Sequence, residues 1–181
     1  MLTTKRFNNF KDIIPFLIHQ NIKEEDVLIL SSSGLLPTLN IVKHHVGLQL
    51  TLLTCISGVD FLTKKYRFCI VYDLLSITFN SRLRLKVIIN EVTSVSTASS
   101  IFINSNWWER EIWDLYGVYF DNHPDLRRIL TDYGFEGHPL RKDFPLSGFV
   151  ETNYDESKKR VVVKPVEFSQ EFRLFTQETP W

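Results

Sequence analysis

The sequence predicts an α+β fold: a two-layer domain with a hairpin-rich, mostly antiparallel sheet and helices on one face, followed by an extended C-terminal tail. The length of 181 residues suits one domain, and a hydrophobic content of 44% is enough for a real core. Apolar residues recur at helical spacing near the N-terminus and at strand spacing after Gln49. The chain turns polar after Gly148, so we expect the α+β domain over residues 1–148 and the tail over residues 149–181.

Two helices and one strand are predicted before Gln49. The first helix is marked by Phe10, Ile13, Ile14, Leu17 and Ile18. The apolar run "VLILS", which starts at Val27, predicts a short strand. The second helix is marked by Leu35, Leu39, Val42 and Val46. Ser33 is in position to cap this helix, and Gly47 is placed to end it.

Three longer strands are predicted after Gln49. The run "QLTLLTCIS" predicts a strand, with Gly58 and Asp60 in the turn that follows it. The runs "YRFCIVYDLLSITF" and "RLRLKVIINE" predict two long strands joined at Asn80–Ser81. In the last strand an apolar row faces the core and a basic row faces solvent or a partner. The apolar row is Leu83, Leu85, Val87 and Ile89, and the basic row is Arg82, Arg84 and Lys86.

The composition argues against several classes of function. Basic and acidic residues both total 21, which argues against a nucleic-acid-binding protein and leaves only a local patch at Arg82, Arg84 and Lys86 as an alternative. Cys55 and Cys69 are too few for an iron–sulfur cluster or a structural zinc, and we expect them to be reduced and buried in strands. The five histidines lack the spacing of metal ligands, and no glycine-rich phosphate loop occurs. We therefore expect this chain to bind no metal, NAD, flavin or cluster.

The stretch "WWEREIWDLYGVYF", residues 107–120, holds three of the four tryptophans and is predicted to be a helix. Asn106 and Glu109 have the spacing of a capping box, and Gly117 is placed to end the helix. Arg110 and Asp114 lie four positions apart and are expected to pair along the surface. The apolar stripe of this helix is Trp108, Ile112 and Leu115.

The carboxylates of this helix leave two interpretations open. In the favoured one Glu109, Glu111 and Asp114 are structural, together with Arg110 and Gly117, although Glu111 has no assigned contact. In the alternative, a free-standing carboxylate-dependent enzyme uses Glu109, Glu111 and Asp114 for acid–base chemistry. That enzyme would need a cleft and a reactive partner group beside the carboxylates.

The segment from Asn122 to Pro145 is dense in prolines, glycines and opposite charges, so we expect neither a plain helix nor a plain strand. Because arginine pairs well with carboxylates at interfaces, one interpretation is a partner interface. The other is a solvated loop with internal ion pairs. The residues assigned to the partner interface are Asp125, Arg127, Arg128, Arg141, Lys142 and Asp143, with Phe168, Phe172 and Trp181 of the tail.

The tail begins with the polar run "ETNYDESKKR", which is expected to be flexible. The run "VVVKPVEFSQEFRLFTQETPW" then alternates apolar and polar residues and carries Pro165 and Pro180. No core remains in the chain for these apolar residues, so we expect the tail to lie extended across another protein. The alternative is a strand that folds back on an edge of the chain's own sheet, where proline is tolerated.

Three motifs carry a resemblance to a known family. The pattern E-R-E-x-x-D-x-x-G begins at Glu109, H-P-D-L-R-R-I-L at His123, and G-H-P-L-R-K-D-F-P at Gly137. This region resembles the signature of the 30-kDa-type subunit of respiratory complex I, the C-type subunit of the bacterial enzyme. "GVDF" at Gly58 and "RFCIVYDLLS" at Arg67 are similar to the family's central strands, and the C-terminal residues resemble the tail of its mitochondrial members.

The resemblance implies a structural and assembly subunit of the peripheral arm that supports the quinone-reducing module and carries no redox centre. The chain would bind no cofactor, while the complex uses NADH, FMN, iron–sulfur clusters and ubiquinone to transfer electrons and pump protons. The implied partners are the 49-kDa-type quinone-site subunit, the 20-kDa-type cluster subunit and the ferredoxin-like subunit. No nucleic acid is implied, and the membrane is reached only through the complex. The implied location is the matrix side of the mitochondrial inner membrane, and the single alanine, Ala98, favours an organelle gene.

Overall fold

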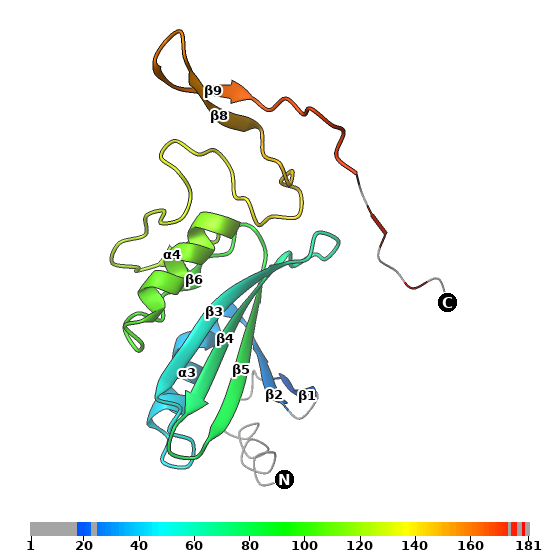
Figure 1. Cartoon of the computed structure of the whole chain (residues 1–181). Coiled ribbons are helices and arrows are strands. Elements are labelled where there is room, and N and C mark those ends of the chain that lie inside the picture. Colours follow the sequence, from blue (N-terminus) through cyan, green and yellow to red (C-terminus); the bar gives the residue numbers. More distant parts are fainter. Residues whose placement is uncertain (1–17, 23–24, 174, 177–178, 180–181) are drawn as a thin grey trace. The chain divides into compact units, whose positions relative to one another are not determined.

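The computed structural model describes residues 18–22, 25–173, 175–176 and 179 (Figure 1). The chain divides into two compact units, Met1–Asp143 and Phe144–Trp181, and each is described by itself. The helix predicted around Phe10 lies outside the described residues, except for Ile18, which begins a strand instead.

The first unit is built on a sheet with the strand order β1-β2-β5-β4-β3. Its strands are β1 (Ile18–Ile22), β2 (Glu25–Leu30), β3 (Leu52–Asp60), β4 (Phe68–Ser76) and β5 (Ser81–Ile89). Neighbouring strands run antiparallel, except that β2 and β5 are parallel. The mostly antiparallel sheet and the hairpin of its two longest predicted strands are therefore confirmed.

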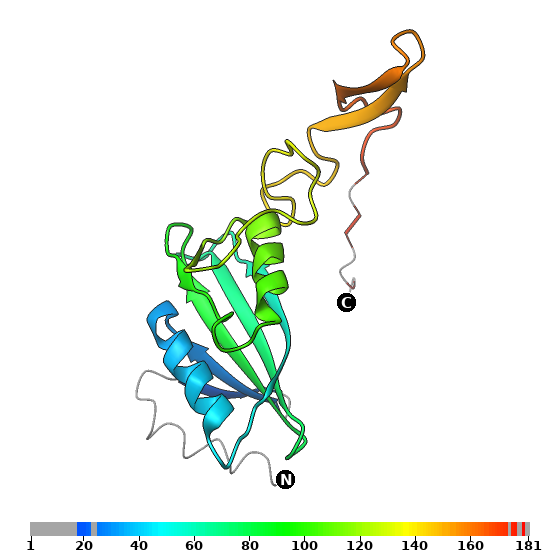
Figure 2. The same cartoon turned by 90° about the vertical axis from the view of Figure 1, so that its left-hand side faces the viewer.

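Within the described residues, two helices cover one face of this sheet (Figure 2). The first, α3 (Leu35–His44), follows a short 3₁₀ turn at Ser32–Gly34, and the second is α4 (Ser105–Tyr116). The predicted alternation in β5 is confirmed, because Arg82 is exposed while the apolar row packs into the core. The core joins both helices to the sheet through Leu35, Leu39, Val42, Ile70, Tyr72, Leu83, Leu85, Val87 and Ile112.

The helix α3 begins and ends at other residues than the sequence predicted. The helix stops at His44, so Val46 is 80% exposed and does not extend its buried face. Ser33 lies in the 3₁₀ turn, and Gly34 occupies the N-cap position. Gly47 lies in the turn beyond the helix rather than at its end.

The turn predicted at Gly58 and Asp60 is wrong, because both residues lie within β3. Asp60 pairs in register with Phe68, and its side chain is fully buried against Arg67. Gly58 is needed for packing here, since a Cβ at this position would approach the ring of Tyr116 to 2.7 Å.

A second strand pair lies beside α4: β6 (Val95–Ser96) runs parallel to β7 (Phe120–Asp121). Residues 122–143 then contain neither a helix nor a strand, as the sequence predicts. We call residues 122–143 the returning segment, because its backbone and side chains bond back to α4.

The second unit contains a hairpin of β8 (Val150–Asp155) and β9 (Arg160–Pro165). The sequence predicted an extended tail here, with a strand on an edge of the chain's own sheet as the alternative. The polar run that was expected to be flexible supplies β8 and its turn, and β9 pairs with β8. The Asp155 carboxylate closes the turn by accepting hydrogen bonds from the Ser157 amide and hydroxyl. Beyond the hairpin Phe168 and Phe172 are exposed, whereas Trp181 lies outside the described residues.

Among the described helices, none combines the length and the apolar character that crossing a bilayer requires.

Candidate functional site

The site consists of α4 and the returning segment, and Glu109 is its first buried anchor. The predicted capping box is wrong: α4 begins after Asn104, and Glu109 points into the interior with no exposed surface. Its Oε1 accepts a hydrogen bond of 2.7 Å from the Ala98 amide, and its Oε2 accepts one of 2.5 Å from the Thr97 hydroxyl. Glu109 therefore ties α4 to the chain that follows β6.

His123 joins the same buried cluster from the returning segment. Its Nε2 lies 3.7 Å from Oε2 of Glu109 and 3.2 Å from the Asn106 carbonyl, and its side chain is fully buried. Its Nδ1 accepts a hydrogen bond from the Asp125 amide, so Nε2 carries the proton in the neutral ring and donates it to the carbonyl. The cluster thus fixes the start of the returning segment on α4.

Burial raises the pKa of Glu109 to about 7, and the hydrogen bonds from Thr97 and Ala98 offset only part of that effect. A carboxyl whose folded pKa exceeds its unfolded value destabilises the fold as pH rises through the interval between them. The loss of stability therefore begins near the ordinary glutamate pKa of 4.5 and is complete above about 7.

We expect Glu109→Gln to remove this pH dependence, because glutamine can keep both contacts without a charge. Between about pH 5 and pH 8, the free energy of unfolding of Glu109→Gln should rise relative to that of the parent chain, by a difference on the order of 3 kcal/mol. Urea unfolding followed by tryptophan fluorescence measures both curves. Glu136→Gln, at an exposed position of the same unit, should leave the parent slope unchanged. Parallel curves for Glu109→Gln and the parent would contradict the buried-carboxyl assignment.

Asp114 is the second buried anchor, and the predicted surface pair with Arg110 is wrong. Its Oδ2 accepts the amides of Ile129, Leu130 and Thr131 at 3.2, 2.7 and 2.9 Å. Its Oδ1 accepts the Thr131 hydroxyl at 2.6 Å. Burial alone would raise the pKa of Asp114, but these donors together outweigh it and hold the pKa below its ordinary value. Asp114 therefore serves as an anionic cap for a turn of the returning segment.

Arg110 and Arg128 also act between α4 and the returning segment. Arg110 is only 7% exposed, lies over the Trp107 ring and donates to the Arg127 carbonyl at 3.1 Å. Arg128 donates to the Phe135 carbonyl at 2.9 Å, and its Nε lies 3.9 Å from Asp114. Both guanidinium groups hold backbone in place rather than pairing along an exposed helix face.

The last turn of α4 is closed by the chain that returns to it. A helix leaves its final four carbonyls without internal partners. In α4 the Trp113 carbonyl accepts the Gly117 amide, and the Leu115 carbonyl accepts the Leu140 amide. The Asp114 carbonyl accepts from Nδ1 of His138 at 2.9 Å, and the Tyr116 carbonyl accepts from Nε of Arg141 at 2.7 Å. All four carbonyls are satisfied.

His138 and Gly117 are suited to this closure. Burial and the nearby Arg141 guanidinium lower the pKa of His138, which keeps the ring neutral. Gly117 ends α4 with φ of 75°, in the left-handed region, as the sequence predicted. A Cβ there would also lie 2.5 Å from His138 and from Arg141, so glycine is required for two reasons.

A partly buried ion network holds the far end of the returning segment. Arg67 makes two bonds to Asp60, at 2.8 and 2.9 Å, and a third to Asp143 at 2.8 Å. It also pairs with Glu91. The Lys142 amide adds a bond of 2.8 Å to Asp60. Hydrogen bonds from Arg67 lower the pKa of both Asp60 and Asp143.

The residues assigned from the sequence to the partner interface thus fall into two groups. Arg128, Arg141 and Asp143 are engaged within the chain by the contacts above. Asp125 and Arg127 pair with each other at 2.9 Å on an exposed surface, and Lys142 is exposed. The sequence reasoning did not single out Asp60, Arg67, Thr97, His123 and His138. Asp60, Arg67 and the two histidines do lie within the motifs that resemble the family, whereas Thr97 lies in none of them.

The acid–base alternative finds no support in this geometry. Glu109 and Asp114 are fully buried, and their oxygens are occupied by the donors described above. Glu111 is half-buried and has no side-chain hydrogen bond or ion pair to a described residue. A pocket on the sheet, lined in part by Asp73 and Arg84, includes none of the three carboxylates.

Comparison with known proteins identifies relatives of the chain. Residues 28–150 match the family described as "Respiratory-chain NADH dehydrogenase, 30 Kd subunit". NADH-ubiquinone oxidoreductase subunit 9 of Prototheca wickerhamii is 46% identical over 180 residues, which cover 96% of this chain and 94% of that protein. Subunit 9 of Reclinomonas americana is 52% identical over 159 residues, which cover 88% and 78%. NADH dehydrogenase (ubiquinone) iron-sulfur protein 3 of Oryza sativa subsp. japonica is 56% identical over 147 residues, which cover 81% and 77%.

A solved structure shares the fold. It belongs to the membrane-bound sulfane sulfur reductase, described as an archaeal respiratory membrane complex. The likeness has a TM-score of 0.68 and covers 88% of this chain and 98% of the other. The two sequences are 20% identical, so this likeness is informative about the fold alone.

The name of the Oryza relative includes "iron-sulfur", but the residues of this chain do not fit a cluster. Cys55 lies opposite Asp73 in the β3–β4 register, so Cys69 is four positions further along β4, about 13 Å away. Across the described residues, no group of three or more His, Cys, Asp or Glu side chains is placed to hold a metal ion. Cys69 is buried and Cys55 partly buried, and both are free thiols within strands.

Proposed function

The chain belongs to the family of 30-kDa subunits of the respiratory-chain NADH dehydrogenase, and from this we propose that it is a structural and assembly subunit of the enzyme's peripheral arm. In this role it supports the quinone-reducing module and hosts no redox centre. The NADH:ubiquinone oxidoreductase activity, with its coupled proton translocation, belongs to the assembled complex.

One observation carries the proposal. The charges that define the signature motifs are used within the chain, where they hold the returning segment on α4. Glu109, Asp114 and Arg141 each bond to backbone or side chains from another part of the first unit. Buried groups saturated in this way organise a surface rather than perform chemistry.

The surface organised by these contacts has the character of a protein interface. The returning segment presents Leu130, Tyr133 and Leu140, which are 60%, 104% and 48% exposed, and α4 adds Trp107 at 64%. Exposed aromatic and apolar side chains within a polar rim are typical of interface cores. Asp125, Arg127, Lys142 and the exposed edge of Asp143 supply that rim.

The hairpin of the second unit supports a role in binding partners as well. A two-stranded hairpin is marginally stable alone in water. In β9 both Val161 and Val163 are at least 60% exposed, and beyond it Phe168 and Phe172 are each 57% exposed. We therefore assign the hairpin and the residues after it to a neighbouring subunit's surface.

The partners proposed are the 49-kDa-type quinone-site subunit, the 20-kDa-type cluster subunit and the ferredoxin-like subunit. A mitochondrial location agrees with family membership and with relatives in organisms such as Oryza sativa. We place the chain on the matrix side of the inner membrane, held there through the complex.

On a native gel the chain should co-migrate with NADH dehydrogenase activity. Migration only as a free small protein would overturn the proposal.

Two arginine variants separate interface from internal roles. Arg127→Gln should leave the free energy of unfolding of the isolated chain unchanged but reduce the amount of assembled complex, because a charge at the rim of an interface steers association. Arg141→Gln should reduce both the free energy of unfolding and the amount of assembled complex, because it also removes the hydrogen bond from Arg141 to the Tyr116 carbonyl. Turnover per assembled complex should be normal in each variant. Normal assembly with lost turnover would point instead to a direct role near quinone.

A further inference from the structure

A second exposed apolar surface lies at the end of the sheet where β3 passes into β4. It consists of side chains that are between 37% and 56% exposed, and we call it the sheet-tip patch. Its members are Val59, Phe61, Leu62, Tyr66 and Ile88. The interface proposed above uses none of them.

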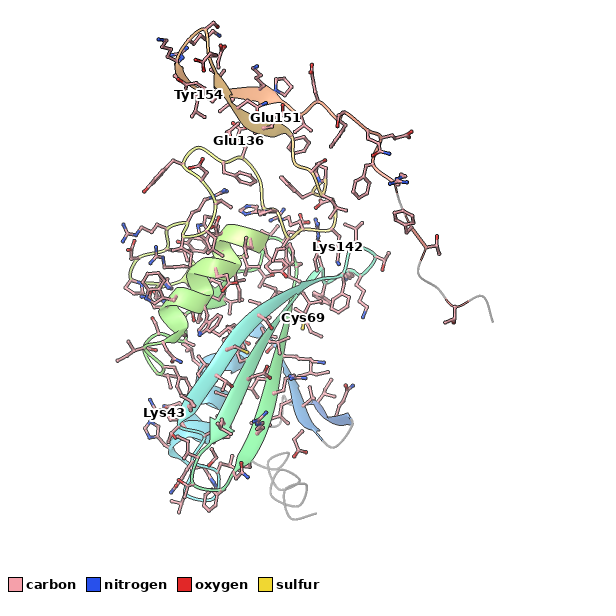
Figure 3. All side chains as sticks on the ribbon, in the orientation of Figure 1. Lys43, Cys69, Glu136, Lys142, Glu151 and Tyr154 are labelled. Atoms are coloured by element: carbon pink, nitrogen blue, oxygen red, sulfur yellow. The ribbon has the colours of Figure 1, made fainter. Side chains whose placement is uncertain are left out.

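The strand register makes this patch continuous. Val59 pairs with Cys69 in β4, and Cys69 pairs with Ile88 in β5, so the three side chains form one cross-strand row. Cys69, labelled in Figure 3, is 6% exposed and fills the middle of the row. Its neighbours Phe68 and Ile70 belong to the core under the helices, so this row faces the other side of the sheet. The patch therefore lies on the sheet face that α3 and α4 leave uncovered.

Lysines surround the patch. Lys64 lies 4.3 Å from the centre of the Phe61 ring, and Lys65 lies 6.0 Å from that of Tyr66. Lys86 pairs in register with Val71, next to the row. No ion pair joins Lys64, Lys65 or Lys86 to any described residue.

The nearest acids are all bound to Arg67 and offset only part of the basic charge. Asp60, at the end of β3, is buried, and it shares the single charge of Arg67 with Glu91 and Asp143. Lys142 adds another cation beside the end of β3, because its amide bonds to Asp60 (Figure 3). Around the apolar centre of the sheet-tip patch, five basic residues thus outnumber three acidic ones, so its rim has a net positive charge: Lys64, Lys65, Arg67, Lys86 and Lys142 against Asp60, Glu91 and Asp143.

We propose that the sheet-tip patch binds an acidic segment of another subunit, in which carboxylates flank apolar side chains. The proposal rests on the assignment of the chain to the assembled complex. An apolar core with charged residues at its rim is the usual anatomy of a protein interface, and complementary charge selects the partner. Nucleic acid would call for a broader basic surface than these few lysines, in a chain with equal numbers of acids and bases.

A zero-length carbodiimide reagent, which joins an amine to a carboxylate in direct contact, tests the proposal on the purified intact complex. Mass spectrometry should find Lys64 or Lys65 linked to an aspartate or glutamate of another subunit. Acetic anhydride should modify these lysines at least about tenfold less in the complex than in the isolated chain. Equal modification in both samples would overturn the proposal. The lysines could also be protected from acetylation without being linked to any protein. If that protection disappears when lipid or nucleic acid is removed, the result would overturn the proposal in favour of that ligand.

Charge variants of Lys64 and Lys65 test whether the patch is needed for assembly. Replacing Lys64 and Lys65 together by glutamate should lower the amount of assembled complex about tenfold, whereas replacing both by arginine should preserve it. Both pairs should leave the free energy of unfolding of the chain unchanged, since neither lysine is buried. Normal assembly of the glutamate pair would overturn the proposal. Absence of the parent chain from the purified complex would instead overturn the proposed function, so the two failures are distinguishable.

Discussion

Arg67→Met is expected to destabilise the first unit by about 3–5 kcal/mol, because it leaves the buried carboxylate of Asp60 without its cation. The Arg67 side chain is 13% exposed and Asp60 is fully buried, so water cannot replace the lost bonds readily. Methionine keeps the apolar stem of the side chain while removing its five donors. Urea unfolding followed by tryptophan fluorescence should show a lower midpoint with a similar slope.

Arg82→Met is the matched control for this variant. Arg82 lies on β5, is exposed, and makes no ion pair to a described residue. Its replacement should change the free energy of unfolding by no more than about 0.5 kcal/mol. Equal effects of Arg67→Met and Arg82→Met would show that the ion network does not stabilise the fold.

Arg67→Met should also release the end of the returning segment. Arg67 bonds to Asp143 across 76 positions of sequence, and Asp60 holds the Lys142 amide across 82. With both contacts weakened, limited proteolysis should cut near residues 142–143 faster than in the parent chain. An unchanged cleavage rate would indicate that other contacts are enough to hold this end.

Asp114→Asn is expected to cost about 3 kcal/mol or more, because four donors lose a charged acceptor inside the protein. The asparagine oxygen can accept from some of them, but its NH₂ group would face the others. Asp125→Asn, the same substitution at an exposed position of the returning segment, should leave chain stability nearly unchanged. Thermal unfolding of the two variants makes the comparison.

The pH dependence of Asp114 gives an independent check. Its folded pKa lies below the ordinary value, so its stabilisation is present above about pH 4 and is lost as pH falls through the folded pKa. Asp114→Asn cannot titrate, so its stability should fall less steeply below pH 4 than that of the parent chain. Identical acid unfolding curves would contradict the role of Asp114 as an anionic cap.

The contacts of the charged residues were the feature that the sequence predicted least well. Helical spacing correctly suggested that Arg110 and Asp114 lie on one helix, but spacing alone contains no information about which side faces the interior. The returning segment covers α4, so both residues are buried and bond to it instead of to each other. The capping box predicted for Glu109 was wrong for the same reason. Glu109 has the right spacing from Asn106, but the hydrogen-bond donors that reach its carboxylate come from Thr97 and Ala98.

The sequence by itself determined the α+β class, the alternating strands, the helix end at Gly117 and the family, because these depend on local periodicity and on contiguous motifs. The tertiary structure alone decided which groups meet. Asp114 binds amides up to 17 positions away, and Arg67 joins Asp60 to Asp143. The β8–β9 hairpin and the sheet-tip patch likewise depend on strand register. Contacts between distant residues follow from how the elements pack, and a local pattern does not encode that packing.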